Sequence, residues 1–125
     1  MNKIRMIALA ACMAATLDAA AQEQEIRLFS HRGGRMEHDE NTLSAFQASY
    51  DAGYRGFETD IRMTRDGALV ITHDSSLERT TNGTGTVEEK TEAEIRRLRT
   101  KQGNKVLFLD ELLEFLEGKE GLYVC

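Results

Sequence analysis

Apolar residues follow two different rhythms along the chain, and the two rhythms alternate. Short apolar runs predict buried strands, which we expect at 26–30, 56–63, 68–72 and 122–125. Apolar residues three or four positions apart predict amphipathic helices, which we expect at 42–52, 91–100 and 109–116. Because helices alternate with strands that have the pattern of buried strands, the sequence predicts an α/β fold.

The spacing also assigns faces to two of these elements. The strand at 56–63 presents Glu58 and Asp60, together with Arg62, on its polar face. The opposite face of this strand is expected to carry Phe57, Thr59, Ile61 and Met63. The helix at 109–116 is expected to bury Leu109, Leu112, Leu113 and Leu116 along one side.

A tight reversal separates the second and third predicted strands. They are connected by the four residues 64–67, which is too short for the crossover that parallel strands need. The two strands must therefore form an antiparallel hairpin, which folds His73 back beside Glu58 and Asp60. The polar, glycine-bearing stretch that follows, 75–87, predicts a surface loop.

Polar residues mark the starts of two predicted helices. Thr91 and Glu94 have the spacing of a capping box. Asn41 or Thr42 can cap the earlier helix, and we expect Glu40 to take part in this capping rather than in a reaction.

The composition fits one small globular domain. The chain has 125 residues, of which 41% are hydrophobic and 30% charged, and its net charge is −5. So acidic a chain does not suit a nucleic-acid backbone, which needs a clustered positive face, and we expect no nucleic-acid partner.

Residues 1–21 have the features of a secretory signal peptide. Lys3 and Arg5 precede an uncharged apolar run at 6–17, and small residues end the segment. The run is shorter than the ~20 residues that span a bilayer, so we expect cleavage, export to the periplasm or beyond, and no membrane span. The alternatives are a lipoprotein signal, which would lipidate Cys12, and a buried N-terminal helix.

The carboxylates of Glu58 and Asp60 are the strongest chemical signal in the chain. Residues at positions i and i+2 of a strand share a face, and two such charges facing a core need a positive partner. A hard divalent cation, Ca²⁺ or Mg²⁺, takes oxygen ligands and meets this need. The alternative is a solvated strand face on which Arg62 neutralises the two charges.

Two histidines follow predicted strands, where α/β folds place catalytic groups. His31 and His73 can divide the roles of base and acid, because an imidazole titrates near neutral pH. Arg32 can grip a phosphate or a carboxylate, and Gly33 and Gly34 let the backbone approach it closely. The alternatives are two structural histidines and a surface arginine in a turn.

In combination these residues resemble the glycerophosphodiester phosphodiesterase family. The matching motifs, in family order, are His31-Arg32-Gly33, Glu40-Asn41-Thr42, Glu58-Thr59-Asp60, Thr64-Arg65-Asp66-Gly67, His73-Asp74, Leu77-x-Arg79-Thr80-Thr81-Asn82-Gly83-x-Gly85 and the helix at 109–116. No single motif is decisive, but the ordered set is highly specific.

The resemblance implies a (β/α)8 barrel that hydrolyses small-molecule glycerophosphodiesters to glycerol 3-phosphate and an alcohol, with a divalent cation. By this likeness Glu58 and Asp60 hold Ca²⁺ or Mg²⁺. His31 then corresponds to the general base, His73 to the general acid and Arg32 to the residue that holds the phosphodiester.

The chain also departs from the family pattern. Asp39 stands where the family usually has a proline, and a second proline, before the helix at 109–116, is absent. The family's next strand carries a third glutamate ligand and a lysine that contacts phosphate, which we expect beyond residue 125. We therefore expect 22–125 to be the N-terminal part of a barrel, truncated after about three strands and inactive alone. The alternatives are a related phospholipase, sphingomyelinase D-like or phosphoinositide-specific, and a non-catalytic module that binds metal or phosphate.

Overall fold

The computed structural model describes residues 26–119 and 123–125 of the chain. The predicted signal peptide, 1–21, and the alternative lipidation site Cys12 lie outside the described residues. Among the residues described, no helix has the length and apolar character needed to cross a membrane.

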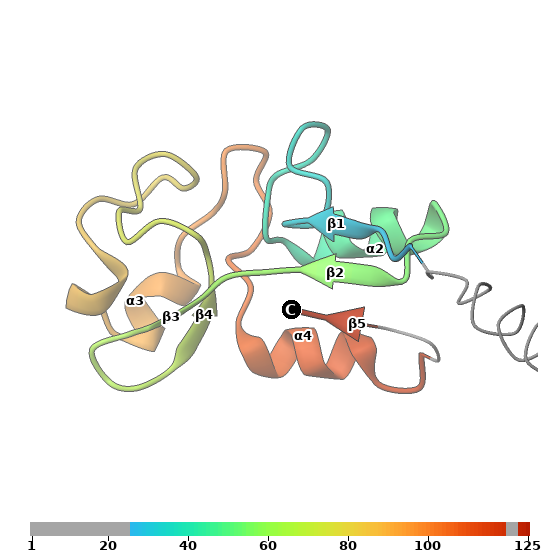
Figure 1. Ribbon diagram of the computed structural model, residues 1–125. Coiled ribbons are helices and arrows are strands. Elements are labelled where there is room, and N and C mark those ends of the chain that lie inside the picture. The colour runs from blue at the N-terminus through green and yellow to red at the C-terminus, as the bar shows by residue number, and fades with distance from the viewer. Residues whose placement is uncertain (1–25, 120–122) are drawn as a thin grey trace, which may run out of the picture.

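Three short parallel strands form the first sheet, in the order β1-β2-β5 (Figure 1). They are β1 (Phe29–His31), β2 (Gly56–Glu58) and β5 (Tyr123–Val124). Ser30 pairs with Phe57, and Phe57 with Val124. Parallel strands connected through helices confirm the predicted α/β fold. The strand predicted at 26–30 is shifted, because the chain from Ile26 to Leu28 is exposed and the pairing with β2 starts at Phe29.

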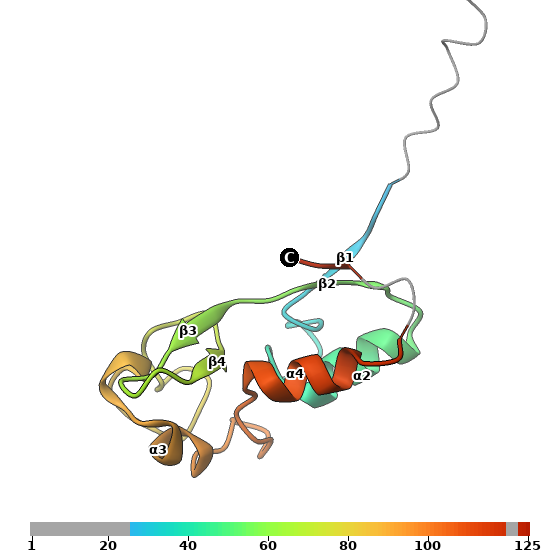
Figure 2. The same ribbon diagram turned by 90° about the horizontal axis from the view of Figure 1, so that it is seen from below.

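Two helices, α2 (Leu43–Asp51) and α4 (Leu109–Leu116), cover one face of this sheet (Figure 2). Thr42 caps α2 by accepting a hydrogen bond from the Ala45 amide at 3.3 Å. The helices and the strands enclose a core made of Phe46, Phe57, Ile71, Leu107 and Leu112. Leu109 and Leu116 pack against this core, but Leu113 is 57% exposed, so its predicted burial is wrong. Phe115 also packs against this core, and Leu113 lies about 100° around the helix from Leu112, at the margin of the side that α4 buries.

A two-stranded antiparallel sheet follows, formed by β3 (Ile61–Met63) and β4 (Leu69–Ile71). Ile61 pairs with Ile71 and Met63 with Leu69, which confirms the predicted hairpin. The single strand predicted at 56–63 is wrong, because the chain leaves the first sheet at Thr59 and Asp60 and enters the second. Ile61 and Met63 are exposed, since the alternation of faces does not continue across this break.

The hairpin has its own core, which gathers residues from distant parts of the chain. Its members are Val70, Leu77, Val87, Ile95, Val106 and Phe108. The predicted surface loop at 75–87 therefore carries core residues, and it leads into a short 3-10 helix, η2 (Val87–Glu89). The helix predicted at 91–100 is confirmed only as α3 (Glu92–Arg96), with the expected capping box between Thr91 and Glu94. It ends early because Arg99 and Thr100 form bridges with Lys105 and Thr81.

Candidate active site

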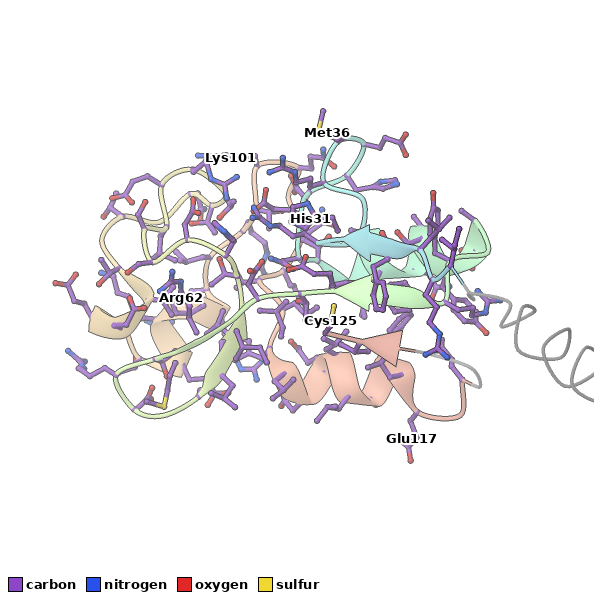
Figure 3. All side chains as sticks on the ribbon, in the orientation of Figure 1. His31, Met36, Arg62, Lys101, Glu117 and Cys125 are labelled. Atoms are coloured by element: carbon purple, nitrogen blue, oxygen red, sulfur yellow. The ribbon has the colours of Figure 1, made fainter. Side chains whose placement is uncertain are left out.

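The carboxyl ends of the parallel strands bring His31 and Glu58 together. His31 ends β1, Glu58 ends β2, and the two residues pair across the sheet. His31 Nε2 lies 3.5 Å from Glu58 Oε2, with both side chains partly exposed. Figure 3 shows His31 at the same end of the sheet as Cys125, which follows β5. The histidine predicted at a strand end and the carboxylate predicted within the next strand therefore share one solvent-accessible edge.

Arg32 is buried directly behind this edge. Its backbone amide donates to the Glu58 carbonyl oxygen at 3.0 Å, and its guanidinium Nη1 donates to Glu40 Oε1 at 3.2 Å. Its Nε lies 3.3 Å from Asp60 Oδ2, but at an angle that does not form a hydrogen bond, and no other described atom pairs with it. The side chain is 9% exposed, so the alternative of a surface arginine is wrong.

Backbone conformation at this turn depends on residues that accept positive φ. Arg32 has a φ of 53° and Gly33 a φ of 75°. A Cβ atom at Gly33 would lie 2.8 Å from the Cβ of Ala45 in α2, so only glycine lets the turn pack against that helix. Positive φ at a non-glycine residue such as Arg32 is strained, and strain of this kind collects at functional sites.

Asn41 and Glu40 serve the site instead of capping α2. Asn41 Nδ2 donates to Asp60 Oδ2 at 3.2 Å, and its Oδ1 accepts from the Thr59 hydroxyl at 3.0 Å. Asn41 is buried with a φ of 58°, a conformation that asparagine tolerates better than most residues. The predicted capping by either residue is wrong, because Thr42 alone supplies the cap among the described side chains. The Glu40-Asn41-Thr42 motif was the signal that pointed to this cluster.

The hairpin carries His73 toward the same cluster. The Thr72 amide donates to the Asp60 carbonyl oxygen at 2.9 Å, so the pairing continues past β3 and β4 up to the residue before His73. The imidazole of His73 is 46% exposed, and its Nδ1 lies 2.6 Å from Asp74 Oδ1. The hairpin therefore places His73 next to Asp60 along the backbone, as the short turn predicted, while its ring contacts Asp74. That His73 also lies beside Glu58 stays a prediction.

Arg62 does not neutralise Glu58 and Asp60. Its Nη1 lies 3.0 Å from Glu88 Oε1, and its Nε donates to the His73 carbonyl oxygen at 2.8 Å. In Figure 3 Arg62 lies over the hairpin, away from His31. The alternative of a strand face that pairs its own charges is therefore wrong.

Two acidic side chains next to the histidines and arginines are held in the charged form. Hydrogen bonding to Arg79 is the main reason why the pKa of Glu40 lies below its ordinary value, and both nearby guanidinium groups add to the effect. Hydrogen bonds from Arg79 and then His73 lower the pKa of Asp74 to about 2. The residue types and their spacing did not predict Glu40, Asp74 or Arg79 as site residues, although all three lie in the matched motifs.

Glu58 and Asp60 have the donor chemistry of a site for a hard cation. Their side chains are 30% and 25% exposed, and their carboxylate oxygens are of the type that Ca²⁺ and Mg²⁺ prefer. Within 26–119 and 123–125, no group of three His, Cys, Asp or Glu side chains is arranged to hold a metal ion. The two carboxylates thus fit as part of a ligand set.

Acidic, basic and cationic groups at the carboxyl ends of parallel strands define the active-site layout of α/β enzymes. Residues 31–122 match the model of the Glycerophosphoryl diester phosphodiesterase family. The chain belongs to this family.

Relatives and solved structures agree with this assignment. A glycerophosphodiester phosphodiesterase of Caldanaerobacter subterraneus subsp. tengcongensis is 35% identical over 102 residues, which are 76% of this chain and 42% of that protein. The crystal structure of glycerophosphodiester phosphodiesterase from Agrobacterium tumefaciens has a TM-score of 0.73 and 36% identity, over 80% of this chain and 46% of that one.

A second solved structure contains a reaction product. It is an Oleispira antarctica phosphodiesterase in complex with the product sn-glycerol-3-phosphate, with a TM-score of 0.73 and 28% identity, over 79% of this chain and 42% of that one. The chain thus spans less than half the length of each of these three proteins.

Proposed function

We propose that this chain supplies the histidines, the phosphate-binding arginine and two metal ligands of an enzyme that hydrolyses glycerophosphodiesters to glycerol 3-phosphate and an alcohol. The observation that carries the proposal is the convergence on one edge of His31, Arg32, Glu58 and Asp60, with Arg32 Nε buried and without a hydrogen-bond partner. An oxygen of a phosphodiester is the group that would accept the missing hydrogen bond from Arg32 Nε. The family and its product complex support this choice of substrate class.

His31 and His73 would divide the proton transfers between them. His31 takes the proton of the substrate's 2-hydroxyl group, whose oxygen attacks phosphorus and forms a cyclic phosphate. His73 gives a proton to the oxygen of the departing alcohol as its bond to phosphorus breaks. In the second step water opens the cyclic phosphate, with the two histidines in exchanged roles. Because Nδ1 of His73 faces Asp74, the Nε2 atom is the one that exchanges the proton with the substrate.

Glu58 and Asp60 would hold Ca²⁺ or Mg²⁺ through their carboxylate oxygens. The cation supplies positive charge that offsets the negative charge of the phosphodiester, which otherwise repels a nucleophile. The guanidinium of Arg32, whose Nε lies 3.3 Å from Asp60 Oδ2, contributes a second positive charge, and the backbone amide of Arg32 donates to Glu58 Oε2 at 3.3 Å.

Release of glycerol 3-phosphate from glycerophosphocholine, with Ca²⁺ or Mg²⁺ and after EDTA treatment, tests the activity. We would compare the 125 residues alone with a polypeptide in which they are followed by the rest of the Agrobacterium relative's barrel. Metal-dependent release by the longer polypeptide is the expected result. Cleavage of sphingomyelin or phosphatidylinositol in its place would assign a related phospholipase. Metal or phosphate binding without any turnover would indicate a non-catalytic module.

The metal role of Glu58 is tested separately from turnover. Glu58→Gln should weaken Ca²⁺ or Mg²⁺ binding in a calorimetric titration, because an amide oxygen carries no charge. Glu88→Gln is the matched control, since that carboxylate pairs with Arg62 on the hairpin. Equal metal affinity in wild type and Glu58→Gln would refute the assignment.

We also propose that the chain is exported through the signal peptide at 1–21. Cell fractionation with N-terminal sequencing of the exported protein tests this. A mature protein that begins at Gln22 is expected, whereas a lipidated Cys12 at the N-terminus would indicate the lipoprotein route.

A further inference from the structure

Arg79 joins two acidic residues that lie far apart in the sequence. Its Nη1 donates to Glu40 Oε2 at 2.9 Å and its Nη2 to Glu40 Oε1 at 2.7 Å, which is a bidentate pair. Its Nε donates to Asp74 Oδ2. One guanidinium therefore ties the turn after β1 to the residue that follows His73.

The segment that carries Arg79 is itself fixed. Leu77 is buried in the hairpin core, and its amide donates to the Gly85 carbonyl oxygen at 3.0 Å. Thr81 is also buried, and its hydroxyl donates to the Leu77 carbonyl oxygen at 2.6 Å. Arg79 lies between these two anchors, so its backbone is held while its side chain reaches out to the carboxylates.

Each of the two carboxylates bound by Arg79 also contacts a residue of the candidate site. Glu40 Oε1 also accepts a hydrogen bond from Arg32 Nη1 at 3.2 Å, so Glu40 lies between the two arginines. Asp74 Oδ1 lies 2.6 Å from His73 Nδ1. Arg79 thus stands at the centre of an unbroken path from Arg32 to the His73 ring.

An isolated surface ion pair contributes little, and Arg79 is 48% exposed. This pair differs in two respects. Glu40 is only 11% exposed, so its charge is largely removed from water, and the contact uses both carboxylate oxygens. In addition, Asp74 stays ionised far below neutral pH because Arg79 bonds to it.

We propose that Arg79 is a positioning residue, which fixes the His73 ring through Asp74 and the Arg32 guanidinium through Glu40. With Asp74 held by Arg79, the Nδ1–H of His73 always has an acceptor, and Nε2 is presented to the substrate. The value of this arrangement for catalysis rests on the proposed role of His73 as the acid, but the orientation of the ring can be measured without any reaction.

The tautomer of His73 is the decisive measurement. Two-bond ¹⁵N–¹H correlation spectra distinguish the Nδ1–H from the Nε2–H form. We would record them on the full chain at a pH high enough for the imidazole to be neutral. We expect Nδ1–H to predominate in the wild type. In Arg79→Gln the ratio of Nδ1–H to Nε2–H should fall by about threefold or more, which is the size of effect that one ion pair can exert. Arg99→Gln is the matched control, because Arg99 donates to the backbone carbonyls of Arg96 and Leu98.

Arg79→Lys gives a second variant that keeps the charge. Lysine cannot bond to Glu40 through two parallel donors and to Asp74 at once, so an intermediate ratio is expected. This variant also decides the matter if Arg79→Gln does not fold. A His73 tautomer ratio in folded Arg79 variants equal to that of Arg99→Gln would overturn the proposal.

The effect of Arg79 on catalysis is measured by steady-state kinetics of the longer polypeptide. Arg79→Gln should lower kcat by about tenfold to a hundredfold, since a misplaced acid loses part of its contribution. Failure of the wild type to cleave glycerophosphodiesters would refute the proposed function but leave the tautomer result standing. A shifted tautomer ratio with unchanged kcat would show that the positioning of His73 by Arg79 does not contribute to catalysis, and would refute that part of the proposal.

Discussion

The parallel sheet and the hairpin bury their apolar side chains in different ways, although their two cores share the strand β4. We call β1, β2, β5, α2 and α4 the sheet region, and residues 61–108, which include β3, β4, η2 and α3, the hairpin region. Within the part of the chain that the structure describes, the sheet region has helices on one face only (Figure 2), and Leu28 is 69% and Phe29 39% exposed. The hairpin region encloses a core of six buried residues drawn from five segments of the chain.

The two cores touch at adjacent residues of β4. Val70 belongs to the hairpin core and Ile71 to the sheet core, because successive side chains of a strand point in opposite directions. The candidate site lies above this junction and takes one histidine from each region. The sheet region supplies His31 on a strand end, while the hairpin region supplies His73 through a network of ion pairs. The positions of the two proton-transfer groups therefore depend on different kinds of support.

The largest expected effect tests this division of roles. His31→Ala and His73→Ala should each lower turnover of glycerophosphocholine by about 10²–10⁴-fold, the usual contribution of a positioned acid or base. Metal affinity should stay nearly unchanged in both variants, and a loss of affinity would make that histidine a ligand. The assay uses the longer polypeptide with the completed barrel.

A substrate with a better leaving group distinguishes the acid role of His73 from the base role of His31. A substrate that releases p-nitrophenolate needs little help from an acid, so His73→Ala should regain most of its rate on the glycerophospho-p-nitrophenyl diester. His31→Ala should remain slow on this substrate, because its 2-hydroxyl group still needs a base. Equal recovery by both variants would contradict the assignment of the acid to the hairpin region.

Much of this arrangement could be predicted from the sequence because it is local. The four-residue turn at 64–67 forces the hairpin, and the position of His31 at a strand end follows from the short apolar run before it. The position of Glu58 at a strand end was not predicted, because the expected strand continued to Met63. The buried position of Arg32 could not be obtained in this way. It depends on a positive φ at Arg32 and on the close contact between Gly33 and Ala45, which only the packing of α2 determines.

Other errors have the same physical origin. The alternation at 56–63 gave no sign that Thr59 and Asp60 lie between two sheets, because a pattern of period two continues across a break. Arg79 lies 39 positions from Glu40, and its neighbours suggest only a polar loop. Contacts between residues so far apart in the sequence are set by tertiary structure. The residue types gave no sign of the contact between Arg79 and Glu40, and only the family motifs that contain both residues pointed to their importance.

The second largest effect compares the two cores. Phe46→Ala removes a ring that packs edge-on against Phe57, with centroids 5.7 Å apart, and should lower the free energy of unfolding by about 3–5 kcal/mol. Ile95→Ala opens a cavity in the enclosed hairpin core and should cost about 2–5 kcal/mol. Leu113→Ala is the control in the same chain, and its cost should stay within about 0.5 kcal/mol, because that side chain is exposed.

Chemical denaturation with hydrogen exchange of individual amides measures these values. Because Val70 and Ile71 couple the cores through one strand, each variant should shift a single transition shared by both regions. Separate midpoints for amides of the sheet region and the hairpin region would show two independent units. The site would then lie across a boundary that can open.

The smallest effect concerns the ion pairs that support His73. Asp74 has a folded-state pKa of about 2, lowered from an ordinary value of 3.8, first by its hydrogen bond from Arg79 and then by that from His73. A carboxylate with a depressed pKa stabilises the fold fully above its ordinary value and loses this contribution as the pH falls through its folded value. The contribution of Asp74 should therefore be present at pH 5 and disappear between about pH 4 and pH 2.

Its size should stay below about 1 kcal/mol, because the Asp74 and Arg79 side chains are 27% and 48% exposed. Denaturation midpoints of wild type and Asp74→Asn, measured from pH 5 to pH 2, should converge at the acid end. Asp110→Asn serves as the comparison, since that aspartate is 74% exposed. A difference between wild type and Asp74→Asn that is constant with pH would mean that Asp74 acts by shape alone. Convergence would instead place an acid-sensitive support of the site in the hairpin region, where Asp74 joins Arg79 to His73.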